Sequence, residues 1–231
     1  MIGRLRQLGA GLLDLVIPPR CAGCGERDTW LCADCRAGLH RLPADRCRRC
    51  AQPGVPTRVC GNCYASPPPF VAVDAPFIHE GLARQLVLDL KYHGHRHLAG
   101  PLAELAATAA PRDVEAVVPV PLHARRRAER GFNQSELLAA GVARAVGVPV
   151  LPDALRRTRE TRPQAGLSEA ERIANVRGAF VPTAKLSRHR VLLVDDVCTT
   201  GATLAACARA LHRAGVREVV ALTVTRAANL Q

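Results

Sequence analysis

Two adjacent acidic residues, Asp195 and Asp196, end an apolar run and are followed by a short segment rich in hydroxyl groups. Backbone N–H groups and threonine hydroxyls in such a segment can surround a phosphate, and the dipole of a following helix adds to the attraction. Two carboxylates beside a phosphate would repel it unless sugar hydroxyls lay between them. The pattern therefore predicts a bound ribose phosphate whose diol donates to the carboxylates. The predicted phosphate-binding residues are Cys198, Thr199, Thr200, Gly201, Ala202 and Thr203.

Two other structures fit an apolar strand that ends on acidic residues. One is the magnesium-binding strand of a P-loop NTPase, which also needs the motif G-x-x-x-x-G-K-[ST]. The chain has two lysines, Lys91 and Lys185, and neither follows a glycine. The other is an ordinary strand, turn and helix in which Thr199 or Thr200 is the N-cap. Paired acids at a strand end are unusual for that structure, so the pattern favours the ribose phosphate.

Eight of the ten cysteines occur before residue 64, in four C-x-x-C pairs. Each pair directs two thiolates at one point, and two pairs complete a tetrahedral Zn²⁺ shell. Consecutive and interleaved pairings of the four motifs both remain open. A disulfide framework or an iron–sulfur cluster would use the same residues, but the shared spacing favours two structural zinc ions. The predicted ligands are Cys21, Cys24, Cys32, Cys35, Cys47, Cys50, Cys60 and Cys63.

Composition limits the class of protein. The 231 residues suffice for one α/β domain and a small module. A net charge of +12 indicates phosphate-bearing partners, either nucleic acid or a phosphorylated metabolite, although arginine richness also follows from genome composition. The aromatic content of 3% argues against a platform on which bases stack.

Membrane-spanning and targeting segments, where a sequence contains them, indicate where the protein is located. No run is long enough to span a bilayer. The first residues contain early arginines and a short apolar patch, but Asp14 interrupts the patch and no cleavage site follows. Apolar residues from Ile2 to Val16 fit helical spacing, so we expect a short docking helix and a cytoplasmic protein.

The elements that position these motifs alternate between strands and helices. The proline-rich segment 65–70 predicts a boundary between a Cys-rich zinc module at residues 1–66 and a second domain at residues 67–231. The second domain is predicted to hold a parallel sheet covered on both faces, with ligands at the carboxyl ends of its strands. Strands are predicted at 71–79, 114–122, 148–155, 190–197 and 217–226, helices at 81–94, 97–110, 133–147 and 201–215, and a long loop or hairpin with a short helix near Ser168 at 156–180.

The segment 191–204, VLLVDDVCTTGATL, resembles the phosphoribosyl pyrophosphate (PRPP) signature of type I phosphoribosyltransferases. From residue 12 onward the chain resembles the ComF family, also called the GntX or competence-protein family. In that family a Cys-rich zinc module precedes a domain of the type I phosphoribosyltransferase fold. Further marks of the resemblance are LKYHGHRHLA (90–99), VVPVPLHARRRAERGFNQSELLA (117–139) and RPQAGLSEAERIANVRGAF (162–180).

The resemblance implies roles for these segments. It implies that Asp195 and Asp196 hold the ribose 2′- and 3′-hydroxyls, that residues 199–203 hold the 5′-phosphate, and that Mg²⁺ accompanies PRPP. A pyrophosphate loop would begin at Val120, and its arginines suit phosphate geometry, although a solvated basic turn would look the same. A flexible closing loop would cover residues 161–176. The implied residues of these two loops are Arg125, Arg126, Arg127, Arg130, Arg162, Gln164 and Arg172.

The resemblance also implies a role in DNA uptake, together with single-stranded DNA and with helicase or recombination proteins. Two functions remain open. The first is a Mg²⁺-dependent phosphoribosyltransferase with an unassigned acceptor. The second is a non-catalytic, zinc-containing accessory protein that binds nucleotides or single-stranded DNA. Active transferases usually have small or glycine residues in the pyrophosphate loop, whereas here no glycine follows Pro121 until Gly131. PRPP binding is therefore a firmer prediction than catalysis.

Overall fold

The computed structural model describes residues 18–56, 58–160 and 169–228. The chain divides into two compact units, residues 1–39 and residues 40–231. The helix predicted near the N-terminus lies outside the described residues. In the first unit, the described residues form the helix α2 (Ala33–Ala37), which follows a turn closed by the bridge between Arg20 and Arg27. Among the described residues, no helix has the length and apolar character needed to cross a membrane.

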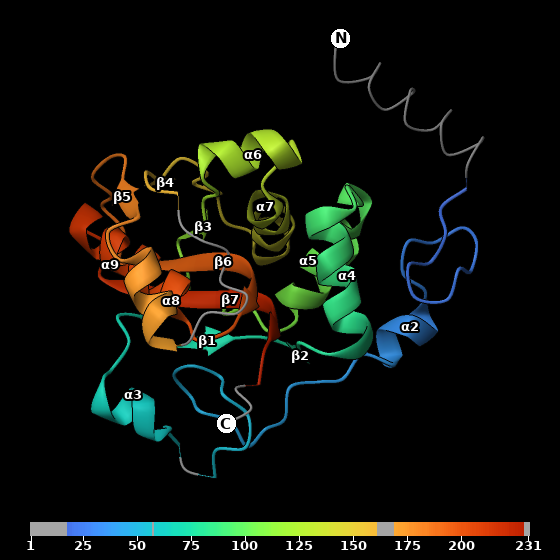
Figure 1. The fold of residues 1–231 in the computed structure, drawn as a ribbon, viewed down its shortest axis with the longest axis horizontal. Helices are drawn as coiled ribbons and strands as arrows, with labels where there is room; N and C mark the ends of the chain where they lie inside the picture. The colour runs from blue at the N-terminus through green and yellow to red at the C-terminus, as the bar shows by residue number, and fades with distance from the viewer. Residues whose placement is uncertain (1–17, 57, 161–168, 229–231) are drawn as a thin grey trace. The chain divides into compact units, whose positions relative to one another are not determined.

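A parallel sheet is the centre of the second unit (Figure 1). Its strand order is β1-β7-β6-β3, and β2 also pairs with β7. The middle strands are apolar throughout because both of their faces are covered, and residues 191–194 are all buried. The strands are β1 (Val73–Asp74), β2 (Phe77–Ile78), β3 (Ala116–Pro119), β6 (Arg190–Cys198) and β7 (Glu218–Arg226).

Helices cover both faces of this sheet, as the sequence predicts (Figure 1). On one face α7 packs on β3 and β6, while α5 packs on α7 and β7. On the other face α9 packs on β6 and β7. The helices of the unit are α3 (Gly61–Ala65), α4 (Gly81–Tyr92), the 3₁₀ turn η1 (Arg96–Leu98), α5 (Ala99–Ala107), α6 (Ala124–Arg130), α7 (Gln134–Val146), α8 (Glu169–Val176) and α9 (Ala202–Ala214).

Two segments differ from the sequence-based expectation. The strand predicted at 148–155 is reduced to one parallel bridge between Val117 and Val150, because two nearby prolines lack the N–H that a ladder needs. The expected basic loop after β3 is the helix α6, which Gly131 ends in a left-handed conformation. The long polar segment agrees with the prediction of a hairpin, because its ends form an antiparallel pair, β4 (Leu155–Arg157) and β5 (Phe180–Pro182), and it also contains the helix α8.

The second cysteine-rich segment belongs to the same compact unit as the sheet. The backbone N–H of Val73 in β1 donates to the Arg49 carbonyl over 2.8 Å, and the Leu42 N–H donates to the Pro76 carbonyl over 2.9 Å. Ala51 is fully buried in the apolar core that lies under β6 and β7. This segment is therefore held to the sheet by backbone hydrogen bonds and by apolar packing.

Candidate functional site

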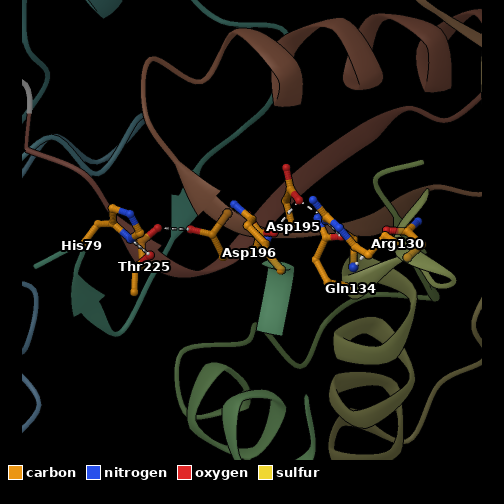
Figure 2. A network of polar contacts seen from close by, with 10 residues as sticks. His79, Arg130, Gln134, Asp195, Asp196 and Thr225 are labelled. Carbon is orange, nitrogen blue, oxygen red and sulfur yellow. Dashed lines mark hydrogen bonds and ion pairs between the residues drawn. The ribbon is translucent and has the colours of Figure 1, made fainter. Parts of the chain in front are cut away.

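A cavity of about 690 Å³ opens at the carboxyl ends of the parallel strands. Ligands of such sheets bind at this edge because the loops that leave the strands gather there. The lining includes Asp195 and Asp196 from β6, Lys91 from α4, Ser135 from α7 and Thr199 from the loop before α9. In Figure 2 the two aspartates lie between the His79–Thr225 pair and the Arg130–Gln134 pair.

Asp195 is bound to the first turn of α7. Its Oδ1 atom accepts a hydrogen bond from the Ser135 hydroxyl over 2.8 Å and another from the Asp196 N–H over 3.0 Å. Burial raises the pKa of Asp195 to about 7, and the Asp196 carboxylate adds to the rise, whereas Lys91 and the Ser135 hydroxyl oppose it. Asp195 therefore changes its charge near neutral pH.

Asp196 is buried, and its two oxygens have different surroundings. Oδ1 lies 2.7 Å from Lys91 Nζ. Burial alone would lower the pKa of Lys91, but the attraction of Asp196 outweighs it and the pKa of Lys91 is raised. Oδ2 has no hydrogen-bond partner among the described residues. A buried acceptor without a donor is costly, so this oxygen is suited to receive a hydroxyl hydrogen from a bound ligand.

Lys91 is a site residue that the sequence analysis misses. Its pairing with Asp196 depends on how the end of α4 meets the end of β6, and no local motif encodes that contact. The available signal is compositional, because Lys91 is one of only two lysines among 32 basic residues of an arginine-rich chain.

The predicted phosphate loop joins β6 to α9. Gly201 is the N-cap of α9, with a φ of 79°, and a Cβ there would lie 3.6 Å from the Phe70 ring. The Thr200 hydroxyl accepts a hydrogen bond from the Ala202 N–H over 3.3 Å. Thr199 and Thr203 line the cavity, whereas Cys198 and Ala202 are buried beside the loop. The loop and the helix N-terminus can therefore offer hydroxyls and backbone N–H groups to an anion.

The predicted arginines separate into two groups. Arg126 and Arg130 line the cavity. Arg130 also contacts Gln134 through a hydrogen bond and lies over the Tyr92 ring, 5.3 Å from its centre. The other two pair with glutamates of the same region, Arg125 with Glu129 and Glu160, and Arg127 with Glu136, and neither lines the cavity.

The structure adds Arg157 and His79 to the cavity lining. Arg157 lies over the Phe180 ring at 5.3 Å, and burial together with the charge of Arg126 lowers its pKa. The Nδ1 atom of His79 lies 2.8 Å from the Thr225 hydroxyl oxygen. Burial and the charge of Lys91 lower the pKa of His79 to about 4, so this imidazole is neutral at pH 7.

The side chains of the three residues predicted for the closing loop lie outside the described part of the structure. Arg162 and Gln164 lie outside the described residues. Arg172 belongs to the helix α8.

The eight early cysteines form two groups of four, in the consecutive pairing. Within each group, all ligand atoms lie within 4.8 Å of one another. The Sγ atoms of Cys24 and Cys32 are 3.7 Å apart, and so are those of Cys50 and Cys60. Four thiolates about 2.3 Å from one Zn²⁺ ion would be about 3.8 Å apart, so the spacing fits zinc. The groups are Cys21, Cys24, Cys32 and Cys35, and Cys47, Cys50, Cys60 and Cys63.

Backbone donors favour the thiolate form of one cysteine in each group. Burial raises the pKa of Cys21 and of Cys47, but hydrogen bonds from backbone N–H groups outweigh burial and bring both pKa values down to about 6. The N–H of Cys32 donates to the Cys21 sulfur over 3.4 Å, and that of Cys60 donates to the Cys47 sulfur over 3.3 Å. None of the ten cysteines forms a disulfide in this structure, and the two clusters of four favour metal sites over a disulfide framework.

Comparison with known families identifies two domains along the chain. Residues 12–64 match the double zinc ribbon domain, and residues 125–229 match the phosphoribosyl transferase domain. The chain is thus a phosphoribosyltransferase-type α/β protein that carries zinc ribbons with structural zinc sites.

Relatives over nearly the full length define the family. Competence protein F of Haemophilus influenzae is 32% identical over 212 residues, which are 85% of this chain and 90% of the relative. DNA utilization protein YhgH of Escherichia coli K12 is 30% identical, over 82% of this chain and 87% of the relative. Competence protein ComFC of Streptococcus pneumoniae is 28% identical, over 86% of this chain and 89% of the relative. The chain belongs to the competence protein F (ComF) family.

Two solved structures are more distant. A glutamine PRPP amidotransferase from B. subtilis is 22% identical, with a TM-score of 0.40, over 58% of this chain and 30% of that one. Orotate phosphoribosyltransferase from Aeropyrum pernix is 18% identical, with a TM-score of 0.34, over 62% of this chain and 76% of that one. Both TM-scores lie below 0.5, so neither likeness supports a conclusion. The domain and family matches favour a phosphoribosyltransferase-like protein over a purely accessory zinc protein.

Proposed function

We propose that this chain binds PRPP, or a related ribose 5-phosphate ester, at the carboxyl edge of its sheet and acts in DNA uptake. The observation that carries the proposal is the unpartnered Oδ2 atom of the buried Asp196, which shares one cavity with the threonine-rich loop before α9. A ribose hydroxyl would supply the missing donor, and the loop would receive the 5′-phosphate.

The cations of the cavity suit the other end of PRPP. Arg126, Arg130 and Arg157 all line it, and guanidinium groups match phosphate oxygens in charge and geometry. Mg²⁺ is expected to arrive with the pyrophosphate, whose charge it would partly neutralise. The ion pair of Lys91 with Asp196 leaves one acidic charge less beside the sugar, which reduces repulsion of the phosphates.

The proposed enzymatic activity is transfer of the phosphoribosyl group to an acceptor that the chain does not reveal. In such a transfer the bond from ribose C1 to pyrophosphate breaks, and a bond from C1 to the acceptor forms. The residues on this cavity would hold the ribose and the leaving group in place, and positioning together with charge compensation supplies most of the acceleration in reactions of this kind.

The role in DNA uptake is inferred from the relatives' names, competence protein and DNA utilization protein. We propose single-stranded DNA and the helicase or recombination proteins of uptake as partners, and a cytoplasmic location as the setting. The net charge of +12 supports contact with DNA. If arginines bind DNA phosphates, affinity must fall steeply as salt rises. A flat salt dependence would remove DNA from the proposal.

Calorimetry with PRPP and Mg²⁺ tests the binding site. Thr199→Ala removes a hydroxyl from the cavity lining, and we expect its Kd for PRPP to rise about tenfold, as for the loss of one hydrogen bond to a charged group. Thr108→Ala is the matched control, because Thr108 ends α5 and donates only to the Leu105 carbonyl in the described contacts. Absence of PRPP binding to the wild type, or equal weakening by both substitutions, would refute the proposed site.

A further inference from the structure

Arg226, the last residue of β7, is a buried cation, with 1% of its surface exposed. Its Nε donates to the Cys50 carbonyl over 2.7 Å, and its Nη2 donates to Gln52 Oε1 over 2.9 Å. Its Nη1 donates to the Cys198 carbonyl over 3.2 Å and also to the Ala227 carbonyl. Burying a charged group is costly unless its donors are satisfied, and here oxygens from three segments accept four hydrogen bonds from the five N–H groups of the guanidinium.

Two of these acceptors, the carbonyls of Cys50 and Cys198, lie on two functional parts of the same compact unit. Cys50 is a ligand of the second cysteine cluster. Cys198 ends β6 at the start of the phosphate loop, and its carbonyl also accepts the Ala227 N–H over 2.9 Å. One planar guanidinium therefore connects the backbone of a metal ligand with the backbone from which the phosphate loop begins.

Apolar packing joins the same two parts. Ala51, the neighbour of Cys50, is fully buried and belongs to one core cluster with Phe70, Cys198 and Ala202. Phe70 lies under the loop, since a Cβ on Gly201 would be 3.6 Å from its ring. A change in the fold of the second cysteine cluster would therefore disturb the support beneath the loop as well as the hydrogen bonds of Arg226.

We propose that Arg226 is a positioning residue that couples the second cysteine cluster to the phosphate loop. Metal in this cluster fixes the Cys50 carbonyl, Arg226 carries the constraint to the Cys198 carbonyl, and the loop is ordered before ligand binds. Because an ordered loop loses less conformational freedom on binding, metal in the second cluster strengthens phosphate binding. The identity of the ligand as PRPP rests on the proposed function; the coupling between cluster and loop does not.

Coupling of this kind is reciprocal, so the ligand must also stabilise the metal. Zinc release to a chromogenic zinc chelator, measured with and without PRPP and Mg²⁺, tests this. We expect PRPP to slow one of two release phases about tenfold and to leave the other unchanged. Cys63→Ser should remove the release phase of the second cluster, and Cys24→Ser should remove that of the first. The phase that PRPP slows must be the one that Cys63→Ser removes. If PRPP binds but slows neither phase, or slows that of the first cluster, the proposal fails.

Substitution of Arg226 tests the link directly. Arg226→Lys keeps the charge but cannot reach both sides with a planar fork. We expect about tenfold weaker PRPP binding with an unchanged zinc content. Val142→Ala is the control for general destabilisation, because Val142 is fully buried in α7 and lies outside the core cluster beneath the loop. If Val142→Ala lowers the melting temperature about as much as Arg226→Lys does, it should still bind PRPP with the wild-type Kd. Wild-type affinity in Arg226→Lys would overturn the proposal.

A measurement without ligand separates this proposal from the proposed function. Hydrogen exchange of the amides in 199–203 should be at least several-fold faster in Arg226→Lys and in Cys63→Ser than in the wild type and in Val142→Ala. If Arg226→Lys does not fold, Gln52→Ala removes the Nη2 bond and takes its place. Failure of PRPP to bind the wild type would refute the proposed function alone, whereas unchanged exchange at these amides would refute the coupling.

Discussion

Asp195 and Asp196 are neighbours in sequence but differ in their electrostatic surroundings. Asp196 is paired with Lys91, whereas Asp195 receives a neutral hydroxyl from Ser135. The pKa of Asp195 is consequently raised to about 7, far above the ordinary 3.8. The folded protein holds this proton at pH values where the unfolded chain has released it. Its contribution to the free energy of unfolding is therefore present below about pH 4 and is lost as the pH rises through 7.

Asp195→Asn should expose this effect. The amide can still accept the Ser135 hydrogen bond but cannot ionise, so the variant lacks the cost of a buried charge. We expect its melting temperature to exceed that of the wild type by more at pH 8 than at pH 5, because the wild type loses this contribution progressively as the pH rises from about 4 to 7. Thermal denaturation at the two pH values measures the difference. A gain of the same size at both would contradict the assigned pKa.

Asp196→Asn, in contrast to Asp195→Asn, should destabilise the folded protein. It leaves the ammonium group of Lys91 buried without its counterion, which costs about 3 kcal/mol in the free energy of unfolding. The double variant Lys91→Met/Asp196→Asn removes the stranded charge and should recover most of that loss. Denaturant unfolding of the three proteins at pH 8 provides the measurement. A double variant no more stable than Asp196→Asn would show that the ion pair is not the cause.

At the scale of elements, the start of α7 connects β3 to the paired acids. Asn133 is its N-cap, accepting the Ser135 N–H over 3.1 Å and donating to the Val120 carbonyl over 3.0 Å. Asn133→Ala should cost roughly 1–2 kcal/mol in the free energy of unfolding, through loss of the cap and of a buried partner.

The same change should weaken PRPP binding, since Ser135 would no longer be held against Asp195. Thr108→Ala, at the exposed end of α5, should change neither quantity. Denaturant unfolding measures the stability of both variants, and calorimetry measures their affinity for PRPP. Unchanged PRPP affinity in a destabilised Asn133→Ala would separate α7 from the site.

Local sequence predicts the elements on which the site depends and misses several of its residues. The apolar run of β6, the glycine before α9 and the Asn133 cap are local signals, and the structure contains all three. The contact of Lys91 with Asp196 depends on tertiary structure, because it joins two chain segments more than 100 residues apart. Arg157 and His79 reach the cavity for the same reason.

The helix α6 was missed for a different reason. Its seven residues include four arginines and none of them is buried, so no apolar periodicity indicates a helix. The predicted strand at 148–155 was wrong because valines favour strands but Pro149 and Pro152 cannot donate to a ladder.

On the scale of the whole molecule, the two cysteine clusters belong to different compact units. The matched sulfur spacing predicts two zinc ions per chain under reducing conditions. Cys24→Ser and Cys63→Ser should each reduce the content to one. Metal analysis by mass spectrometry measures this number. A content of one in the wild type would contradict the paired-cluster assignment.

The family assignment predicts a phenotype for the whole protein. In Haemophilus influenzae lacking competence protein F, this chain should restore transformation. Asp195→Asn, which is expected to fold, should restore it less well if ribose phosphate binding serves uptake. Transformation frequency at matched protein levels is the measurement. Full restoration by Asp195→Asn would separate DNA uptake from the cavity.

The central claim is that the carboxylates at the end of β6 bind a sugar diol while the following loop binds its phosphate. Calorimetry with ribose 5-phosphate and 2-deoxyribose 5-phosphate tests it most directly, since the two ligands differ by one hydroxyl. We predict at least tenfold tighter binding of the ribose compound, because the deoxy sugar leaves a buried carboxylate without a donor. Thr199→Ala should weaken both ligands and preserve their ratio. Equal affinity of the wild type for the two sugars would contradict the claim.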